Sequence, residues 1–196
     1  MTELAIEGAH AFTPEVFPDR RGLFVTTFQQ PRFTETTGHA FPVVQTCQSE
    51  SARGVVRGVH FTATPPGMAK HVYCGRGRAL DFVVDLRVGS PTFGTWDTVE
   101  LGAGSFRSTY LPVGVGHAFV ALEDDTTMVY LMSGPYVAEN ELAVSPLDPE
   151  LALPLALNGV EPVMSDRDVA APTLAQALAA GILPDYETCR ALEAAL

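Results

Sequence analysis

The sequence predicts an all-β protein that ends in short helices, and three observations support this prediction. From about residue 10 to residue 150, apolar residues occur in short runs rich in Val, Thr, Phe and Tyr, as they do in strands. Turn formers such as Pro-Pro-Gly, Gly-Ser-Pro and Glu-Asp-Asp separate these runs at roughly even spacing, which is typical of an antiparallel sandwich or barrel. Helical signals appear only at the C-terminal end.

The expected elements follow one another in chain order. Thr173 can cap a helix that stops at Gly181 and Pro184, and residues 186–196 then show apolar spacing near 3.6. No repeat or low-complexity linker divides the chain, so we predict a single domain over 1–196, with a β barrel over about 10–150 and a helical tail over about 170–196. The expected strands are residues 23–28, 42–47, 54–61, 70–74, 79–86, 96–101, 108–113, 116–122 and 127–132.

Composition excludes several classes of partner. The formal net charge of −11 argues against nucleic acid and against an acidic membrane surface, since both require a basic surface. A few arginines that line one pocket can still bind a small anion. Three cysteines at irregular spacing indicate free thiols, and the acidic residues near the N-terminus do not resemble a signal peptide, so we expect a cytoplasmic protein.

Strand parity indicates where polar contents could lie. In residues 79–86, Leu80, Phe82, Val84 and Leu86 alternate with Asp81, Val83 and Asp85. The two carboxylates therefore share a face, which is either solvated or the wall of a cavity with polar contents. His117, Phe119 and Ala121 likewise share one face of their strand.

Arg57 and His60 are three residues apart, so a regular strand would point them to opposite faces. Gly58 lies between them and can host a bulge that brings both side chains to one face. The sequence leaves open whether this bulge is formed.

Familiar catalytic motifs do not fit this chain. A metal site needs three converging ligands, and no His-x-His pair supplies two of them from one strand. Gly-x-Ser-x-Gly, Gly-x-Gly-x-x-Gly and P-loop motifs are also absent, so nucleophilic, nicotinamide and ATP chemistry lack support. We therefore expect no metal and no cofactor.

Acid–base chemistry without a cofactor remains. A histidine held by a carboxylate can take a proton from carbon, and a tyrosine can return one. A lysine can face a developing enolate as a compact positive charge, and Lys70 is the only lysine in a chain with eleven arginines. Taken singly, such a histidine or tyrosine is more often structural.

Three motifs give these residues a context. VRGVHF, DLRVGSPTFG and LPVGVGHAF occur in this order and spacing, together with PPGMAKHVYC and MSDRD. With them the chain resembles the dTDP-4-dehydrorhamnose 3,5-epimerase family from Phe17 to Asp168. It looks most like the antibiotic deoxysugar branch of actinomycetes. The resemblance implies an all-β, cupin-like jelly-roll barrel with short C-terminal helices, which acts without a cofactor as a homodimer on a dTDP-linked 4-keto-6-deoxysugar.

The resemblance also implies residue roles. His60 would be the base, Asp168 would orient it, Lys70 would face the enolate oxygen and Tyr130 would be the acid. Two further residues, His117 and Asp81, would support the sugar pocket. The nucleotide or the pocket edge would be contacted by Arg21, Gln45, Arg57, Arg107, Glu141 and Arg167, with Arg21 reaching into the neighbouring subunit's site.

Four positions depart from the commoner pattern of the family. Thr26 stands where a glutamate is usual and Cys47 where an asparagine is usual. Leu131 replaces a frequent lysine, and Pro135 replaces an aromatic residue near the nucleotide base. These departures bear on the sugar and on the carbon that is inverted. We therefore predict a 3,5-epimerase of deoxysugar biosynthesis, with a single-carbon (5- or 3-) epimerase as the alternative and a non-catalytic sugar-nucleotide-binding protein as a more distant one.

Overall fold

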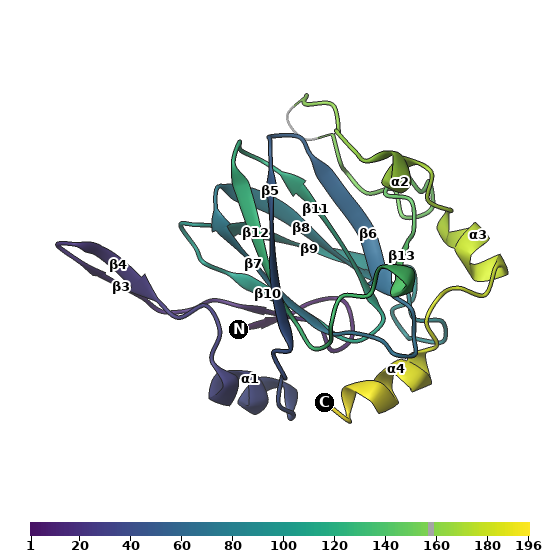
Figure 1. The fold of residues 1–196 in the computed structure, drawn as a ribbon, viewed down its shortest axis with the longest axis horizontal. Helices are drawn as coiled ribbons and strands as arrows, with labels where there is room; N and C mark the ends of the chain where they lie inside the picture. Colours follow the sequence, from purple (N-terminus) through teal and green to yellow (C-terminus); the bar gives the residue numbers. More distant parts are fainter. Residues whose placement is uncertain (157–158) are drawn as a thin grey trace.

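The structure, a computed structural model, describes residues 1–156 and 159–196. Its main body consists of two antiparallel sheets that face each other (Figure 1). The all-β prediction with C-terminal helices is confirmed. The six-stranded sheet has the order β1 (Thr2–Glu3), β2 (His10–Phe12), β10 (Ser108–Leu111), β7 (Lys70–Arg76), β12 (Thr126–Met132) and β5 (Gln45–Ser51).

The second sheet has five strands, and it does not close onto the first by hydrogen bonds within the described residues. The architecture is therefore a jelly-roll sandwich whose two sheets stay separate. Its order is β13 (Glu141–Ala143), β6 (Val56–Thr62), β11 (Val115–Ala121), β8 (Arg78–Asp85) and β9 (Trp96–Gly102). A short 3₁₀ turn, η1 (Ala138–Asn140), leads into β13.

Three apolar clusters hold these layers together. The first fills the space between the sheets and includes Val72, Val83, Phe119 and Met128. Its counterpart on the outer face of the five-stranded sheet is covered by the segment after β13 and by α3 (Leu174–Ala179). The third lies outside the six-stranded sheet, under α1 (Gln30–Thr37) and α4 (Tyr186–Glu193). Apolar area is thus removed from water on both sides of each sheet, which is the main stabilising term.

The parity prediction for β8 is confirmed, although of its two carboxylates only Asp81 lies beside the cavity. Phe82 and Val84 pack outward in the second cluster, whereas Val83 faces the other sheet and Asp81 is fully buried beside His117. Asp85 lies at the end of β8, and its carboxylate binds the Arg87 guanidinium at 2.8 Å instead of facing the cavity. Asp85 still pairs in register with Val115 of the first cluster, so the alternation continues to the end of β8.

The expectation that helices occur only at the C-terminal end is wrong, because α1 spans Gln30–Thr37. Pro31 occupies the first turn, where its missing N–H costs no hydrogen bond, and Gly38 ends the helix with φ 82°. Phe33 is the one residue of α1 that is buried, so this eight-residue helix shows no repeating apolar pattern in the sequence. The one-turn helix α2 (Asp166–Val169) also escaped prediction, and Ser165 caps it.

Beyond the main body, β3 (Val16–Asp19) and β4 (Gly22–Val25) pair only with each other within the described chain. This hairpin stands clear of both sheets (Figure 1) and exposes Phe17, Leu23 and Phe24. Cys47, Cys74 and Cys189 are free, as the sequence predicts. In residues 1–156 and 159–196, no helix is both long and apolar enough to span a membrane.

Candidate functional site

A cavity of about 380 Å³ lies between the two sheets and collects most of the predicted site residues. Side chains from opposite sheets face one another across it, so a bound molecule would be contacted on both sides. The six-stranded sheet supplies Gln45, Cys47, Ser49, Lys70, Tyr130 and Met132, and the other sheet supplies Arg57, His60, His117, Phe119 and Glu141.

The bulge at Gly58 is confirmed. Along β6, His60 pairs with His117 and Arg57 pairs with Phe119, so β6 uses one residue more than β11 between these two pairs. The extra residue turns Arg57 and His60 toward the same cavity, as the sequence allowed. Gly58 has φ 128°, a conformation that is strained for any residue with a side chain.

Gly58→Ala is expected to destabilise the protein strongly. A Cβ there would lie 2.4 Å from the Ala118 Cβ and 2.5 Å from the His117 carbonyl oxygen. Overpacking and backbone strain together predict a loss of roughly 3 kcal/mol or more in the free energy of unfolding. Gly75→Ala is the matched control, because its Cβ would come no closer than 3.7 Å to any neighbour. Urea unfolding of both variants checks this, and equal midpoints would contradict it.

His60 and Asp168 form a dyad although they are 108 residues apart. The His60 Nε2 lies 2.7 Å from the Asp168 Oδ1, and Asp168 is held in α2 by the Ser165 cap, whose hydroxyl accepts from the Asp168 N–H at 3.1 Å. Burial raises the pKa of Asp168, but the hydrogen bonds from His60 and Ser165 outweigh burial and leave this pKa below its usual value. An ionised Asp168 fixes the proton on Nε2, so Nδ1 of His60 is the nitrogen left to act as a base.

A second dyad lies deeper in the cavity wall. The His117 Nε2 is 2.5 Å from the Asp81 Oδ1, and the His117 side chain is 7% exposed, against 32% for His60. The His117 ring meets the Tyr130 ring edge to face at 5.9 Å. Exposure therefore distinguishes the two histidines: His60 is accessible to a ligand, and His117 supports Tyr130.

Lys70 is held at the cavity by an acid and a hydroxyl. Its Nζ lies 3.5 Å from the Glu141 Oε2, and the other oxygen of Glu141 accepts from the Thr62 hydroxyl at 2.8 Å. The Lys70 and Glu141 side chains are only 10% and 8% exposed. Burial lowers the pKa of Lys70, and Glu141 opposes this shift by stabilising the ammonium.

Tyr130 is a very weak acid at the cavity. Burial raises its pKa to about 12, and the hydrogen bond to Ser49 partly offsets that rise. The Tyr130 and Ser49 oxygens are 3.3 Å apart. Tyr130 is therefore fully protonated at neutral pH, which is the form that can give a proton.

Polar groups at the edge of the cavity are held in place by the backbone. The Arg57 Nε donates to the Ser51 hydroxyl at 3.2 Å, and another guanidinium nitrogen donates to the Glu50 carbonyl at 3.1 Å. Arg167 donates to the Glu141 carbonyl at 2.6 Å and is exposed. The Gln45 Oε1 accepts from the Tyr136 N–H at 2.8 Å. The guanidinium groups of Arg57 and Arg167 are fixed donors that suit an anionic ligand at the mouth of the cavity.

Arg21 and Arg107 neither line the cavity nor hydrogen-bond to a residue that lines it within the described chain. Arg21 is on the projecting β3–β4 hairpin, where its guanidinium pairs with Asp19 at 2.5 Å and its side chain is 83% exposed. Arg107 lies directly before β10, and it does not line the cavity. Both roles therefore remain predictions, and that of Arg21 depends on a second subunit.

Sequence reasoning missed three residues at the cavity. Ser49, Thr62 and Tyr136 contact or line the predicted site, yet none was selected. Parity along β5 was a usable signal for Ser49, since Gln45, Cys47 and Ser49 alternate on one face. In residues 1–156 and 159–196, no three His, Cys, Asp or Glu side chains converge as metal ligands do.

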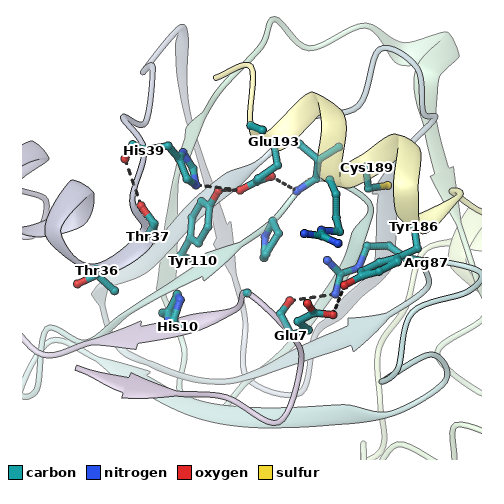
Figure 2. Close-up of a pocket in the computed structure, with 15 residues that line it drawn as sticks. Glu7, His10, Thr36, Thr37, His39, Arg87, Tyr110, Tyr186, Cys189 and Glu193 are labelled. Atoms are coloured by element: carbon teal, nitrogen blue, oxygen red, sulfur yellow. Dashed lines mark hydrogen bonds and ion pairs between the residues drawn. The ribbon is translucent and has the colours of Figure 1, made fainter.

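A second cavity, of about 310 Å³, lies away from this site between α1 and α4 (Figure 2). The Glu193 carboxylate on α4 accepts from the Val113 N–H at 2.7 Å and from the Tyr110 hydroxyl, and it lies 3.4 Å from the His39 Nε2. On the other side of the cavity, Tyr186 donates to Glu7. Glu193 thus fastens the C-terminal helix to both the six-stranded sheet and the segment after α1.

The Glu193 contact predicts a pH-dependent contribution to stability. The hydrogen bond with Glu193 raises the pKa of His39 in the folded protein. The contact therefore stabilises the folded state fully at pH values below the ordinary histidine pKa of about 6.5. This stabilisation is lost as the pH rises through the raised pKa of the folded state. Glu193→Gln should therefore lower the melting temperature more at pH 5.5 than at pH 8.5. The cavity is also lined by His10, Glu7 and Arg190. These residues are the same in the wild-type protein and in the Glu193→Gln variant.

Glu187→Gln is the control for this effect. Glu187 lies on the same helix, 78% exposed, and its only ion pair within the described residues is to Arg190 at 4.0 Å. We expect it to shift the melting temperature little and equally at both pH values. An equal loss at both pH values in Glu193→Gln would contradict the assignment of the His39 shift to Glu193.

Comparisons with known proteins define the class and then the family. A family model described as dTDP-4-dehydrorhamnose 3,5-epimerase matches residues 3–176. The chain is 50% identical over 189 residues to a dTDP-4-dehydrorhamnose 3,5-epimerase of Mycolicibacterium smegmatis, covering 96% of this chain and 92% of that protein. It is 47% identical over 187 residues to a Streptomyces dTDP-4-dehydro-6-deoxyglucose 3-epimerase, covering 95% of each.

Solved structures agree with these matches. The 3'-monoepimerase ChmJ from Streptomyces bikiniensis, in complex with dTDP-quinovose, superposes with a TM-score of 0.94 at 45% identity and covers 100% of this chain and 98% of its own. Its H60N/Y130F double mutant, in complex with dTDP, gives a TM-score of 0.95 at 44% identity, with the same coverage. Fold and site thus define a jelly-roll epimerase. The chain belongs to the dTDP-4-dehydrorhamnose 3,5-epimerase family, so the family and the cupin-like fold predicted from its motifs are confirmed.

Proposed function

We propose that this protein epimerises a dTDP-linked 4-keto-6-deoxyhexose at carbon 3, carbon 5 or both, by removing and returning a proton next to the ketone. One observation carries the proposal: the His60–Asp168 dyad, Lys70 and Tyr130 meet at one cavity. A module that only bound sugar nucleotides would need the arginines but not a base, an acid and a buried ammonium.

The base and the acid stand on opposite walls, as inversion requires. His60 belongs to β6 of the five-stranded sheet and Tyr130 to β12 of the six-stranded sheet. His60 Nδ1 would take the proton from carbon while ionised Asp168 stabilises the imidazolium. Tyr130 would then deliver a proton to the other face of the enolate.

Lys70 would stabilise the enolate between these two steps. The keto oxygen gains negative charge as the C–H bond breaks, and the Lys70 ammonium is a fixed positive charge at a site from which most water is excluded. Glu141, which accepts from the Thr62 hydroxyl, holds the ammonium at 3.5 Å without covering it. No metal or cofactor is required for this sequence of steps.

The nucleotide end and the partner are also proposed. Arg57, Gln45 and Arg167 are the polar groups at the edge of the cavity that suit a diphosphate and a base. ChmJ is described with dTDP and with dTDP-quinovose, which supports the same ligand class here. We further propose a homodimer in which the exposed hairpin carries Arg21 to the neighbouring site, and a cytoplasmic location where the three thiols stay reduced.

The inverted carbon separates the main proposal from its alternative. Curated relatives include both 3,5-epimerases and 3-epimerases at 47–50% identity, so identity alone does not choose. Tyr130 at the cavity favours a route in which a proton returns from the opposite wall. Cys47 lines the cavity and Pro135 directly precedes Tyr136, which also lines it, so these two departures are the first candidates for controlling selectivity.

Proton NMR of dTDP-4-keto-6-deoxyglucose with the protein in deuterated water tests the function. Loss of the proton signals at both carbon 3 and carbon 5 would support a 3,5-epimerase, with His60 serving both positions. A loss at one carbon would support the single-carbon alternative. If neither signal is lost, here or with 2-deoxy and 3-amino analogues, while dTDP still binds, the non-catalytic reading replaces the proposal.

A further inference from the structure

We propose that Ser49 is the positioning residue for Tyr130: its hydroxyl aims the phenol and stabilises the phenolate left when Tyr130 gives up its proton. This inference rests on the proposed function. It adds to it a residue that no motif singled out, and it assigns that residue to one half-reaction, the return of the proton.

The contact comes from the geometry of two neighbouring strands. Tyr130 on β12 pairs in register with Cys47 on β5, and Ser49 is the next residue of β5 on the same face. The phenol reaches diagonally past Cys47, so its oxygen ends 3.3 Å from the Ser49 Oγ. The edge contact from the His117 ring fixes the plane of the Tyr130 ring, and Ser49 fixes the position of its oxygen.

The phenol has few other neighbours that can support it. Within the described residues, Ser49 is the only group that hydrogen-bonds the Tyr130 oxygen. Of the charged groups around it, Arg57 favours the phenolate, whereas Asp81 disfavours it. Arg57 itself is bound to Ser51 and to the Glu50 carbonyl, so it acts from a distance. A buried phenolate without a donor is costly, and the Ser49 hydroxyl supplies that donor.

The direction of the hydrogen bond matters for the chemistry. A hydroxyl can both donate and accept, so Ser49 and Tyr130 can share their bond in either sense. When Ser49 donates, the phenol proton is free to point into the cavity. The same donor is then already in place when the proton leaves, and no group has to reorganise.

Nothing else in the described chain employs the Ser49 side chain. Cys47 contacts Gln45 and Met132, and Ser51 holds Arg57, whereas Ser49 has its single hydrogen bond to Tyr130. Removing its hydroxyl should therefore leave the dyad, the lysine and the arginine in place. This makes a selective test possible.

The test compares Ser49→Ala, Ser49→Thr and the control Ser51→Ala in deuterated water. NMR measures two rates: deuterium uptake into unreacted substrate, which reports proton removal by His60, and formation of the epimer, which also needs Tyr130. Ser49→Ala should slow epimer formation about tenfold while changing uptake less than about twofold, because one hydrogen bond to a developing charge is lost. Ser49→Thr, which keeps the hydroxyl, should recover most of this loss.

Ser51→Ala should instead raise KM and leave the ratio of the two rates unchanged, because Ser51 holds Arg57. A further variant decides between a role through Tyr130 and a general structural role. In a Tyr130→Phe background, Ser49→Ala should cause no additional loss of epimer formation.

Equal slowing of both rates by Ser49→Ala, or an additional tenfold loss in the Tyr130→Phe background, would overturn the proposal. If the wild-type protein neither exchanges nor inverts its substrate, the proposed function fails and this inference fails with it. Wild-type turnover with an unchanged ratio in Ser49→Ala overturns the inference alone.

Discussion

His60→Ala is expected to abolish epimerisation while dTDP binding stays nearly intact. Among the residues that the structure describes, the His60 imidazole is the only group at the cavity that is both accessible and held by a carboxylate, with the Asp168 oxygen at 2.7 Å. Loss of a positioned base lowers kcat by about 10²–10⁴-fold. We propose Arg57 and its neighbours for the dTDP end, and they do not contact His60 by any hydrogen bond in the described chain. Kinetics and calorimetric titration with dTDP measure the two properties separately.

His39→Gln is the matched control for this variant, because His39 lies at the second cavity and touches none of the residues at the first. It should keep kcat within about twofold of the wild-type value. His60→Ala that turned over at a near wild-type rate would refute the assignment of the base. Loss of dTDP binding in His60→Ala, with folding intact, would refute the separation of the sugar end from the nucleotide end.

Lys70→Arg is expected to be almost as damaging, although it preserves the charge. The Lys70 side chain is 10% exposed and faces Glu141 in a space shaped for a narrow ammonium. A planar guanidinium is wider, pairs with carboxylates through two nitrogens and would turn toward Glu141 and away from the keto oxygen. We expect kcat to fall by about 100-fold or more, the scale of losing one preorganised donor to a developing oxyanion.

Arg57→Lys is the converse exchange and serves as the control. It also keeps the positive charge and changes only the shape of the side chain. Arg57 lies at the edge of the cavity, so this change should mainly raise KM and leave kcat within a few-fold. If Lys70→Arg retained near wild-type kcat, the proposed contact between a compact ammonium and the enolate would be wrong. Steady-state kinetics of both variants, with melting curves to verify folding, decide the question.

The strands were predictable from sequence because local composition determines them. β-branched and aromatic runs such as Val56–Thr62 and Thr126–Met132 carry their own signal, and the turns between them are marked by Pro, Gly and Asp. α1 carried no such signal, since only Phe33 of its eight residues is buried. Its helix depends on tertiary packing under the six-stranded sheet, which a local pattern cannot contain.

The site was predictable only in part for a related reason. Parity brought Asp81 to the interior, and glycine chemistry anticipated the bulge that joins Arg57 to His60. No spacing rule connects His60 to Asp168 across 108 residues, so that pair came from family resemblance. Parity could have placed Ser49 on the cavity face of its strand, but a serine by itself does not indicate any particular chemistry. Its role can be recognised only when its partner on the neighbouring strand, Tyr130, is known.

The single lysine gives this protein a chemical handle on its own cavity. An amine-specific acylating reagent has two targets in the chain, the exposed N-terminal Met1 and the buried Lys70. Burial lowers the pKa of Lys70 and so enlarges its unprotonated, reactive fraction at a given pH. Acylation of both amines adds two mass increments to the intact protein. A bound sugar nucleotide should shield Lys70 and so remove one of these two increments. Occupancy of the cavity can then be followed on the purified protein, without a labelled ligand and without turnover.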